Sequence, residues 1–141
     1  NFRAGRKAKP LLRSCSKDEN NKFTLIGAND GFNYFGAQHT RKLIVKLNAN
    51  KDLAFSLSDE VRCSKLMAWR QCWHLGPDIN DDILFLIVNE LRKNFLLKYE
   101  IKNTWHSYDF GKKLSRKSLF IQGFINPGTY FFNVNLVINS P

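Results

Sequence analysis

The sequence lacks the residues and runs that mark several protein classes. Its three cysteines, Cys15, Cys63 and Cys72, are an odd number spread over 141 residues. This argues against a disulfide-rich secreted mini-protein but allows one disulfide and a free thiol. No Asn-x-Ser/Thr glycosylation acceptor occurs. The most apolar run, Ile83 to Val88, has six residues, far too few to cross a bilayer, so we expect buried core there and no membrane span.

Signatures of catalysis and cofactor binding are missing too. There is no Gly-x-Ser-x-Gly, P-loop or dinucleotide-binding motif. The segment His106–Asp109 contains the residue types of a hydrolase site, but neighbours in sequence rarely point at one another. Cys63, Cys72 and His74 lack the paired spacing of a zinc site, and buried thiols are the favoured interpretation. We therefore expect no enzymatic activity, no metal and no cofactor.

Positive charge, by contrast, is abundant. The chain has 22 Lys and Arg against 12 Asp and Glu, a formal net charge of +10. With 43% hydrophobic and 13% aromatic residues it also has the material for a folded core. Such a surface suits nucleic-acid phosphates, anionic membranes or acidic glycans, and a plain soluble basic protein is the alternative.

Residues 1–21 are interpreted as a basic N-terminal arm, ahead of a β-sandwich domain over 22–141. Gly5 and Pro10 interrupt the arm, so no regular secondary structure is expected in it. Its basic residues predict contact with phosphates, and an irregular surface terminus is the alternative. The chain begins at Asn1 rather than Met, so we expect a processed protein or a fragment.

Alternating apolar and polar residues predict short strands joined by turns. The expected strands are 23–26 and 32–35 around an Asn-Asp-Gly turn, 41–48 paired with a strand through Leu53 and Leu57, 118–124, and 129–138. Turns recur at intervals of about ten residues. The predicted fold class is mainly β, an antiparallel sandwich or jelly roll of about eight strands with one or two short helices.

Residues 58–75 and 80–94 are ambiguous between helix and strand. For 58–75 a helix is favoured, because Ser58 can cap it and Gly76 followed by Pro77 can end it. The alternative is a strand with Met67, Trp69 and Trp73 on one face.

For 80–94 strands are favoured, because six successive apolar residues leave no polar helix face. Ile83–Val88 would be a buried strand, 92–94 a turn, and Phe95, Leu97, Tyr99 and Ile101 an inward face opposite Lys98, Glu100 and Lys102. These three outward residues form no recognisable site. The alternative is a helix from Asn80 to Asn94, which would have an acidic start and a basic end.

Residues 103–117 are expected to form a long loop in which aromatic residues precede basic ones. Trp105, Tyr108 and Phe110 could stack on unpaired bases while Lys and Arg hold phosphates. The alternative is that the three rings anchor the loop in the core. The predicted nucleic-acid-binding residues are Arg3, Arg6, Lys7, Lys9, Arg13, Trp105, Lys112, Lys113, Arg116 and Lys117.

The favoured hypothesis is a non-enzymatic structural protein that binds nucleic acid, RNA in particular, within a homo-oligomer or larger assembly. A basic arm ahead of a small β-sandwich resembles the layout of small jelly-roll capsid proteins. On this hypothesis a virion or an intracellular ribonucleoprotein is the favoured location. One alternative is a secreted β-sandwich that binds a lipid, glycan or protein, which a Cys63–Cys72 disulfide would favour. Another is a basic subunit of a ribonucleoprotein such as the ribosome.

Overall fold

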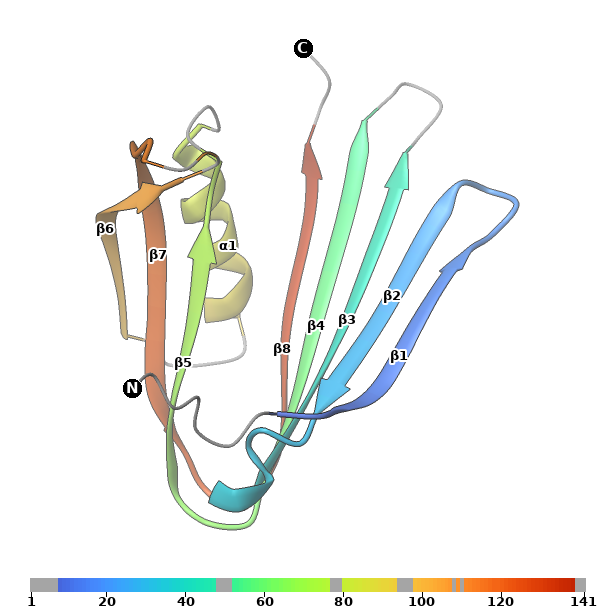
Figure 1. The fold of residues 1–141 in the computed structure, drawn as a ribbon, viewed down its shortest axis with the longest axis vertical. Helices are drawn as coiled ribbons and strands as arrows, with labels where there is room; N and C mark the ends of the chain where they lie inside the picture. Colours follow the sequence, from blue (N-terminus) through green and yellow to red (C-terminus); the bar gives the residue numbers. More distant parts are fainter. Residues whose placement is uncertain are drawn as a thin grey trace. The chain divides into compact units, whose positions relative to one another are not determined.

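The chain is mainly β (Figure 1). Eight strands, one α-helix and a short 3-10 helix occur in the part that the computed structural model describes, and the strands form two antiparallel sheets. The expected class, mainly β with about eight strands and one or two short helices, is confirmed. The described residues are 8–47, 52–76, 80–93, 98–107, 109 and 111–138.

The chain divides into two compact units. The first unit comprises Asn1–Met67 and Asn126–Pro141 and holds a five-stranded sheet. The second unit comprises Ala68–Ile125 and holds a three-stranded sheet with the α-helix. The division into an arm over 1–21 and one domain over 22–141 stays a prediction.

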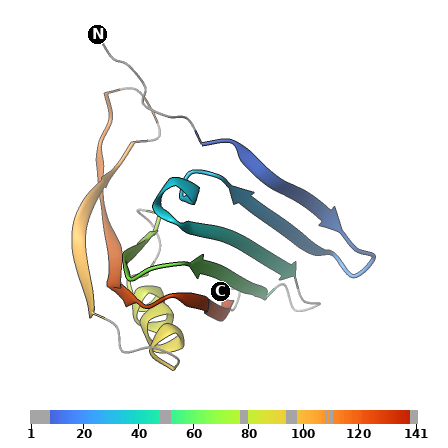
Figure 2. The same ribbon diagram turned by 90° about the horizontal axis from the view of Figure 1, so that it is seen from below.

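The sheet of the first unit has the strand order β1-β2-β3-β4-β8, and each strand is antiparallel to its neighbours (Figure 2). Its strands are β1 (Pro10–Lys17), β2 (Lys22–Asn29), β3 (Ala37–Leu47), β4 (Leu53–Cys63) and β8 (Gly128–Ile138). The predicted pairing of 41–48 with the next strand and the predicted strand 129–138 are confirmed. Leu57 of β4 lies opposite Val134 of β8, and both are buried, as alternation along each strand requires.

A buried carboxylate joins β3 to β4. Asp59 is 3% exposed. Arg41 donates from Nε and Nη2 to its two carboxylate oxygens at 2.7 Å each, and Nε2 of His39 lies 2.9 Å from Oδ1. Burial by itself would raise the pKa of Asp59, but the hydrogen bonds from Arg41 and His39 outweigh it and lower the pKa. The carboxylate therefore stays charged inside the sheet.

The predicted return strand 32–35 is wrong. Asn33–Phe35 is a 3-10 helix, and Gly36 follows with φ of 76°. The side chain of Asn29 accepts a hydrogen bond from the backbone N–H of Gly31, which bends the chain locally. The chain therefore returns only at β3, which pairs with β2 along its length.

The expectation that residues 1–21 lack regular structure is wrong for Pro10–Lys17, which is strand β1. This strand pairs with β2 from Pro10 to Lys17. Pro10 is its first residue, a position where the missing N–H costs little. Pairing with β2 therefore overrides the weak local preference of this segment for irregular structure.

The favoured helix over 58–75 is also wrong. Its first part ends strand β4, and Met67–His74 is strand β5. Ser58 and Asp59, which resemble a helix start in sequence, lie in β4, where Arg41 and His39 hold Asp59. The alternative is confirmed for β5, in which Met67, Trp69 and Trp73 alternate with exposed residues.

The favoured strand over Ile83–Val88 is wrong in turn, because Asp82–Arg92 is helix α1. Its buried face recurs every three or four residues and consists of Leu84, Ile87, Val88 and Leu91. Phe85 and Leu86 of the apolar run are about half exposed, so the run does not lie wholly in the core. Phe95 and Leu97 lie outside the described residues. No described helix is long and apolar enough to span a membrane.

The sheet of the second unit has the order β5-β7-β6, with β6 at Lys98–His106 and β7 at Leu114–Ile125. The expected long loop over 103–117 is therefore wrong, because most of it belongs to two paired strands. Helix α1 covers one face of this sheet, where Arg92 lies over the ring of Tyr99 and Asp81 accepts a hydrogen bond from Lys117. Tyr108 and Phe110 lie outside the described residues.

Candidate functional site

The face of the three-stranded sheet that α1 leaves uncovered has basic and aromatic side chains side by side. Residues opposite one another in β6 and β7 share a face, so the even-numbered residues of both strands lie on this side. Two side-chain hydrogen bonds show that Arg70 and His74 of β5 also lie on this face. Arg70 bonds to Gln122, and His74 bonds to Ser118. We call this surface the open face.

A cationic row crosses all three strands of the open face. Arg70 of β5 donates from Nη2 to Oε1 of Gln122 of β7 at 3.1 Å. Gln122 lies opposite Lys98 of β6. Within the described part of the chain, neither Arg70 nor Lys98 forms an ion pair with a carboxylate. Both charges can therefore act on a bound anion.

Two hollows flank this row. One of about 360 Å³ includes Phe120 in its lining, and the other, of about 790 Å³, includes Phe124. Arg70, Lys98 and Gln122 line both hollows, and we call the two together the basic groove. Phe124 is 78% exposed, so its ring is accessible to a ligand.

Acidic groups reduce the charge of the groove only slightly. Among its described lining residues the one carboxylate is that of Glu100, which pairs with Lys102 at 2.9 Å. The two cations of the row have no such partner, so the groove remains positive.

A neutral hydrogen-bond network lies farther along the open face. The hydroxyl of Ser118 is 2.7 Å from Nδ1 of His74 and 2.5 Å from the hydroxyl of Thr104. Burial and the nearby charge of Arg116 lower the pKa of His74, so this ring is neutral near pH 7. Ser118 is fully buried, so its hydroxyl serves to join the strands.

The structure separates the residues that the sequence grouped as one binding surface. Trp105 lies opposite Ser115 and on the face of Lys117, whereas Arg116 lies on the open face. Trp105 is 66% exposed. Lys117 pairs with Asp81.

Lys112 and Lys113 lie in the connection between β6 and β7, and Lys112 pairs with Asp109 at 3.0 Å. Lys9 and Arg13 belong to the first unit, the former just before β1 and the latter in it. Arg3, Arg6 and Lys7 lie outside the described residues.

The other candidate clusters of the sequence are not assembled. Ser107 donates to the backbone carbonyl of Asp109, and His106 faces Arg116. Cys63 is buried and donates from Sγ to the carbonyl of Asn126, and Cys72 is exposed on β5. The three cysteines form no disulfide. Across the described ranges, no group of three or more His, Cys, Asp or Glu could hold a metal.

Comparison with known proteins finds no matching protein family and no matching curated protein. Two solved structures match, those of heparan sulfate lyase HepC from Pedobacter heparinus and of a mutant of it. Their TM-scores are 0.63 and 0.64 at 18% sequence identity, over 95% of this chain. The match covers 22% of the lyase chain. The likeness is one of fold.

Sequence patterns did not reveal the basic groove. Arg70 lies in a segment that resembles a helix, and the outward residues Lys98 and Lys102 had no visible partner. Gln122 is 52 residues from Arg70 in sequence, so only the pairing of the strands brings them together. The sequence did contain one indication of the groove. Lys98, Glu100 and Lys102 are every second residue of a predicted strand, so they share one face of it.

Proposed function

We propose that this chain is a non-enzymatic β module that binds an acidic polysaccharide in the basic groove. The observation that supports this most is the row Arg70–Gln122–Lys98 with an aromatic residue on either side. Guanidinium and ammonium groups pair with sulfate and carboxylate groups, and the amide of Gln122 can bond to a hydroxyl. The rings of Phe120 and Phe124 offer apolar surface to sugar rings.

Two further features support an acidic glycan as ligand. The structurally similar protein is, by its name, a lyase of heparan sulfate, which is an acidic glycan. The two aromatic rings are also far enough apart to contact separate sugar residues. Phe120 and Phe124 are four residues apart on one strand, a distance of about 13 Å.

The first test measures binding of the full chain to immobilised heparan sulfate, hyaluronan and poly(U) RNA between about 50 and 200 mM salt. We expect the tightest binding to heparan sulfate, because it has both sulfate and carboxylate groups, and a clear loss of affinity as salt rises. Tighter binding to poly(U), or binding that salt does not change, contradicts the proposal.

The exposed thiol of Cys72 provides a second prediction. Cys72 lies between Arg70 and His74 on β5, so alternation places it on the open face. In a Cys15→Ser variant it is the exposed thiol, because Cys63 is buried. Heparan sulfate at about ten times its dissociation constant should slow the alkylation of Cys72 by uncharged iodoacetamide about tenfold.

The control for this measurement is alkylation in the presence of dextran, an uncharged polysaccharide. Dextran should leave the rate of Cys72 alkylation unchanged. If heparan sulfate binds and yet Cys72 reacts at its free rate, the bound glycan lies elsewhere and the basic groove is the wrong site.

A second candidate function rests on Trp105. Its ring is largely exposed and lies on the same face as Lys117, an arrangement on which an unpaired base can stack. The chain would then be a structural protein of an RNA-containing assembly such as a capsid. Substitution Trp105→Ala should weaken poly(U) binding about tenfold and leave heparan sulfate binding unchanged. Unchanged poly(U) binding contradicts this candidate.

A further inference from the structure

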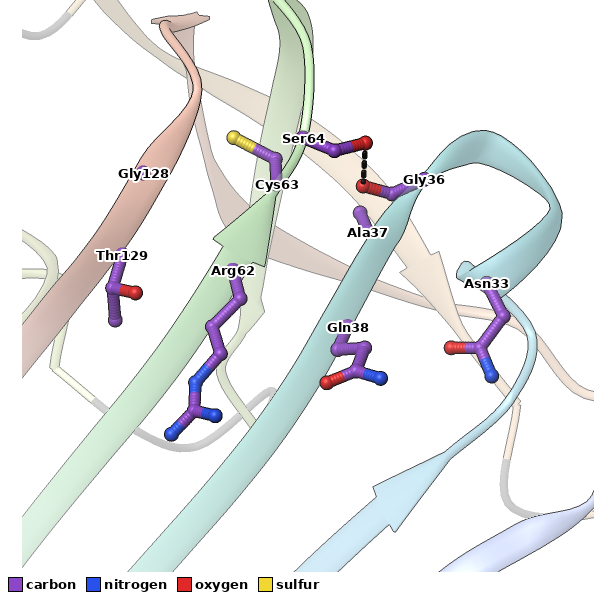
Figure 3. A pocket seen from close by; sticks show the side chains of 9 residues that line it. All are labelled: Asn33, Gly36, Ala37, Gln38, Arg62, Cys63, Ser64, Gly128 and Thr129. Atoms are coloured by element: carbon purple, nitrogen blue, oxygen red, sulfur yellow. Dashed lines mark hydrogen bonds between the residues drawn. The ribbon is translucent and has the colours of Figure 1, made fainter.

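The first unit contains a hollow of about 440 Å³ on its five-stranded sheet, in which hydrogen-bonding side chains lie beside apolar surface (Figure 3). Gln38 of β3 lies opposite Arg62 of β4, which lies opposite Thr129 of β8. Opposite residues of antiparallel strands share a face, so the three side chains stand side by side at one level of the sheet. Asn33 of the 3-10 helix adds a second amide to the lining.

Two glycines shape this hollow. Gly36 has φ of 76°, and a Cβ atom there would lie 2.6 Å from Oγ of Ser64. The backbone N–H and the hydroxyl of Ser64 both donate to the carbonyl of Gly36, at 2.9 and 3.1 Å. Gly128, with φ of 152°, begins β8 beside Thr129. No larger side chain fits these two positions without strain, so the backbone at this end of the hollow requires glycine.

The hollow has hydrogen-bonding groups but little net charge. Arg62 donates from Nε to Glu60 at 2.6 Å, which fixes the guanidinium and balances its charge. The other N–H groups of Arg62 remain donors, whereas the amides of Gln38 and Asn33 and the hydroxyl of Thr129 both donate and accept.

We infer that this hollow binds an uncharged sugar residue. A sugar hydroxyl donates one hydrogen bond and accepts others, so it requires donors and acceptors side by side, which the row Gln38–Arg62–Thr129 supplies. The carboxylate of Glu60, which pairs with Arg62, would repel an anion. Charge therefore does not favour an anionic ligand in this hollow. The volume lies within the range of about 300 to 1,000 Å³ typical of small-molecule sites. The inference is independent of the basic groove, which lies in the other unit.

The test is a titration of the isotope-labelled full chain with glucose, galactose, mannose and N-acetylglucosamine, followed by NMR of the backbone amides. At least one sugar should shift the amide signals of Gln38, Arg62 and Thr129 at millimolar concentration, because a shallow site makes few contacts. Binding should not change with salt, since no net charge is paired. If none of the four sugars shifts these signals, the inference is wrong.

Substitution Thr129→Val removes the hydroxyl and keeps the shape of the side chain. It should weaken binding of the same sugar about three- to tenfold, the effect of one hydrogen bond. Thr24→Val is the matched control, because Thr24 lies on the same face of the sheet outside the hollow, and it should bind as the wild type does. Equal binding by both variants overturns the inference. If variants of the basic groove lose heparan sulfate binding, sugar binding in the hollow should not change, because the two sites lie in different units.

Discussion

Substitution Asp59→Asn is expected to lower the free energy of unfolding by about 3 kcal/mol, the lower end of the range for breaking a buried ion pair. Asp59 is almost fully buried and holds both Arg41 and His39. An amide at this position accepts fewer hydrogen bonds and leaves Arg41 without its counter-charge. The side chain of Arg41 is 47% exposed, so it can turn to water, which keeps the loss from being larger. Urea unfolding followed by circular dichroism measures the difference.

Glu60, the residue that follows Asp59 in β4, supplies a matched control for the Asp59→Asn substitution. Glu60 also pairs with an arginine, Arg62, at 2.6 Å, but the pair lies on the opposite face and is more exposed. Substitution Glu60→Gln should therefore change stability by less than about 1 kcal/mol. If Asp59→Asn and Glu60→Gln lowered the free energy of unfolding equally, burial of the Asp59 ion pair would not explain its contribution to stability.

The contribution of Asp59 should also disappear in acid. Its pKa in the folded protein is lowered, so its contribution is complete above the unfolded value of about 3.9 and is lost as pH falls through the folded value. The stability difference between wild type and Asp59→Asn should therefore shrink as pH falls below about pH 4. A difference that stays constant down to about pH 2 contradicts this account.

Alternation in the sequence predicted the strands whose two faces differ in polarity. In β3 the apolar residues Leu43, Val45 and Leu47 alternate with Lys42 and Lys46, and the predicted strand is present. The same holds for β8. In these segments local pattern and tertiary packing favour the same structure, so the sequence alone suffices.

Two of the wrong assignments, the helix over 58–75 and the strand over Ile83–Val88, exchanged helix and strand. Asp59 matches the acidic first turn of a helix, yet in the protein its charge is balanced by Arg41 of the neighbouring strand β3. The run Ile83–Val88 matches a buried strand, yet as a helix it leaves Phe85 half exposed. For Asp59 the deciding partner is distant in sequence, so local preference predicted the wrong element.

The candidate site was harder to predict than the fold, because its residues come from three strands. The sequence placed Trp105 and Arg116 in one loop, but pairing of β6 with β7 puts them on opposite faces. Arg70 and Lys98 are on β5 and β6, which are both edge strands of the sheet and are joined only through β7. A basic composition predicted an anionic partner in general terms, and only the strand order selects which cations can contact it together.

Reversing the two cations of the row should cause the largest loss of binding. In the double variant Arg70→Glu/Lys98→Glu, affinity for heparan sulfate at about 50 mM salt should fall about 100-fold. This corresponds to loss of two charge-assisted contacts of about 1.5 kcal/mol each. Both side chains lack a carboxylate partner among the described residues, so the fold should tolerate the change. Equilibrium binding to the immobilised glycan measures affinity, and circular dichroism checks folding.

The matched control is Lys112→Glu/Lys113→Glu, which changes net charge equally in the same unit but in the connection between β6 and β7. If the ligand contacts the basic groove, this variant should lose less than about fivefold, because the connection lies at the opposite end of the β6–β7 pair from Lys98 and salt screens distant exposed charges. The dependence of affinity on salt should also become weaker in the groove variant, since fewer ions are displaced on binding. Equal losses in the two variants would mean that only net charge matters. The groove proposal would then be wrong, because binding by net charge alone requires no particular arrangement of Arg70, Gln122 and Lys98.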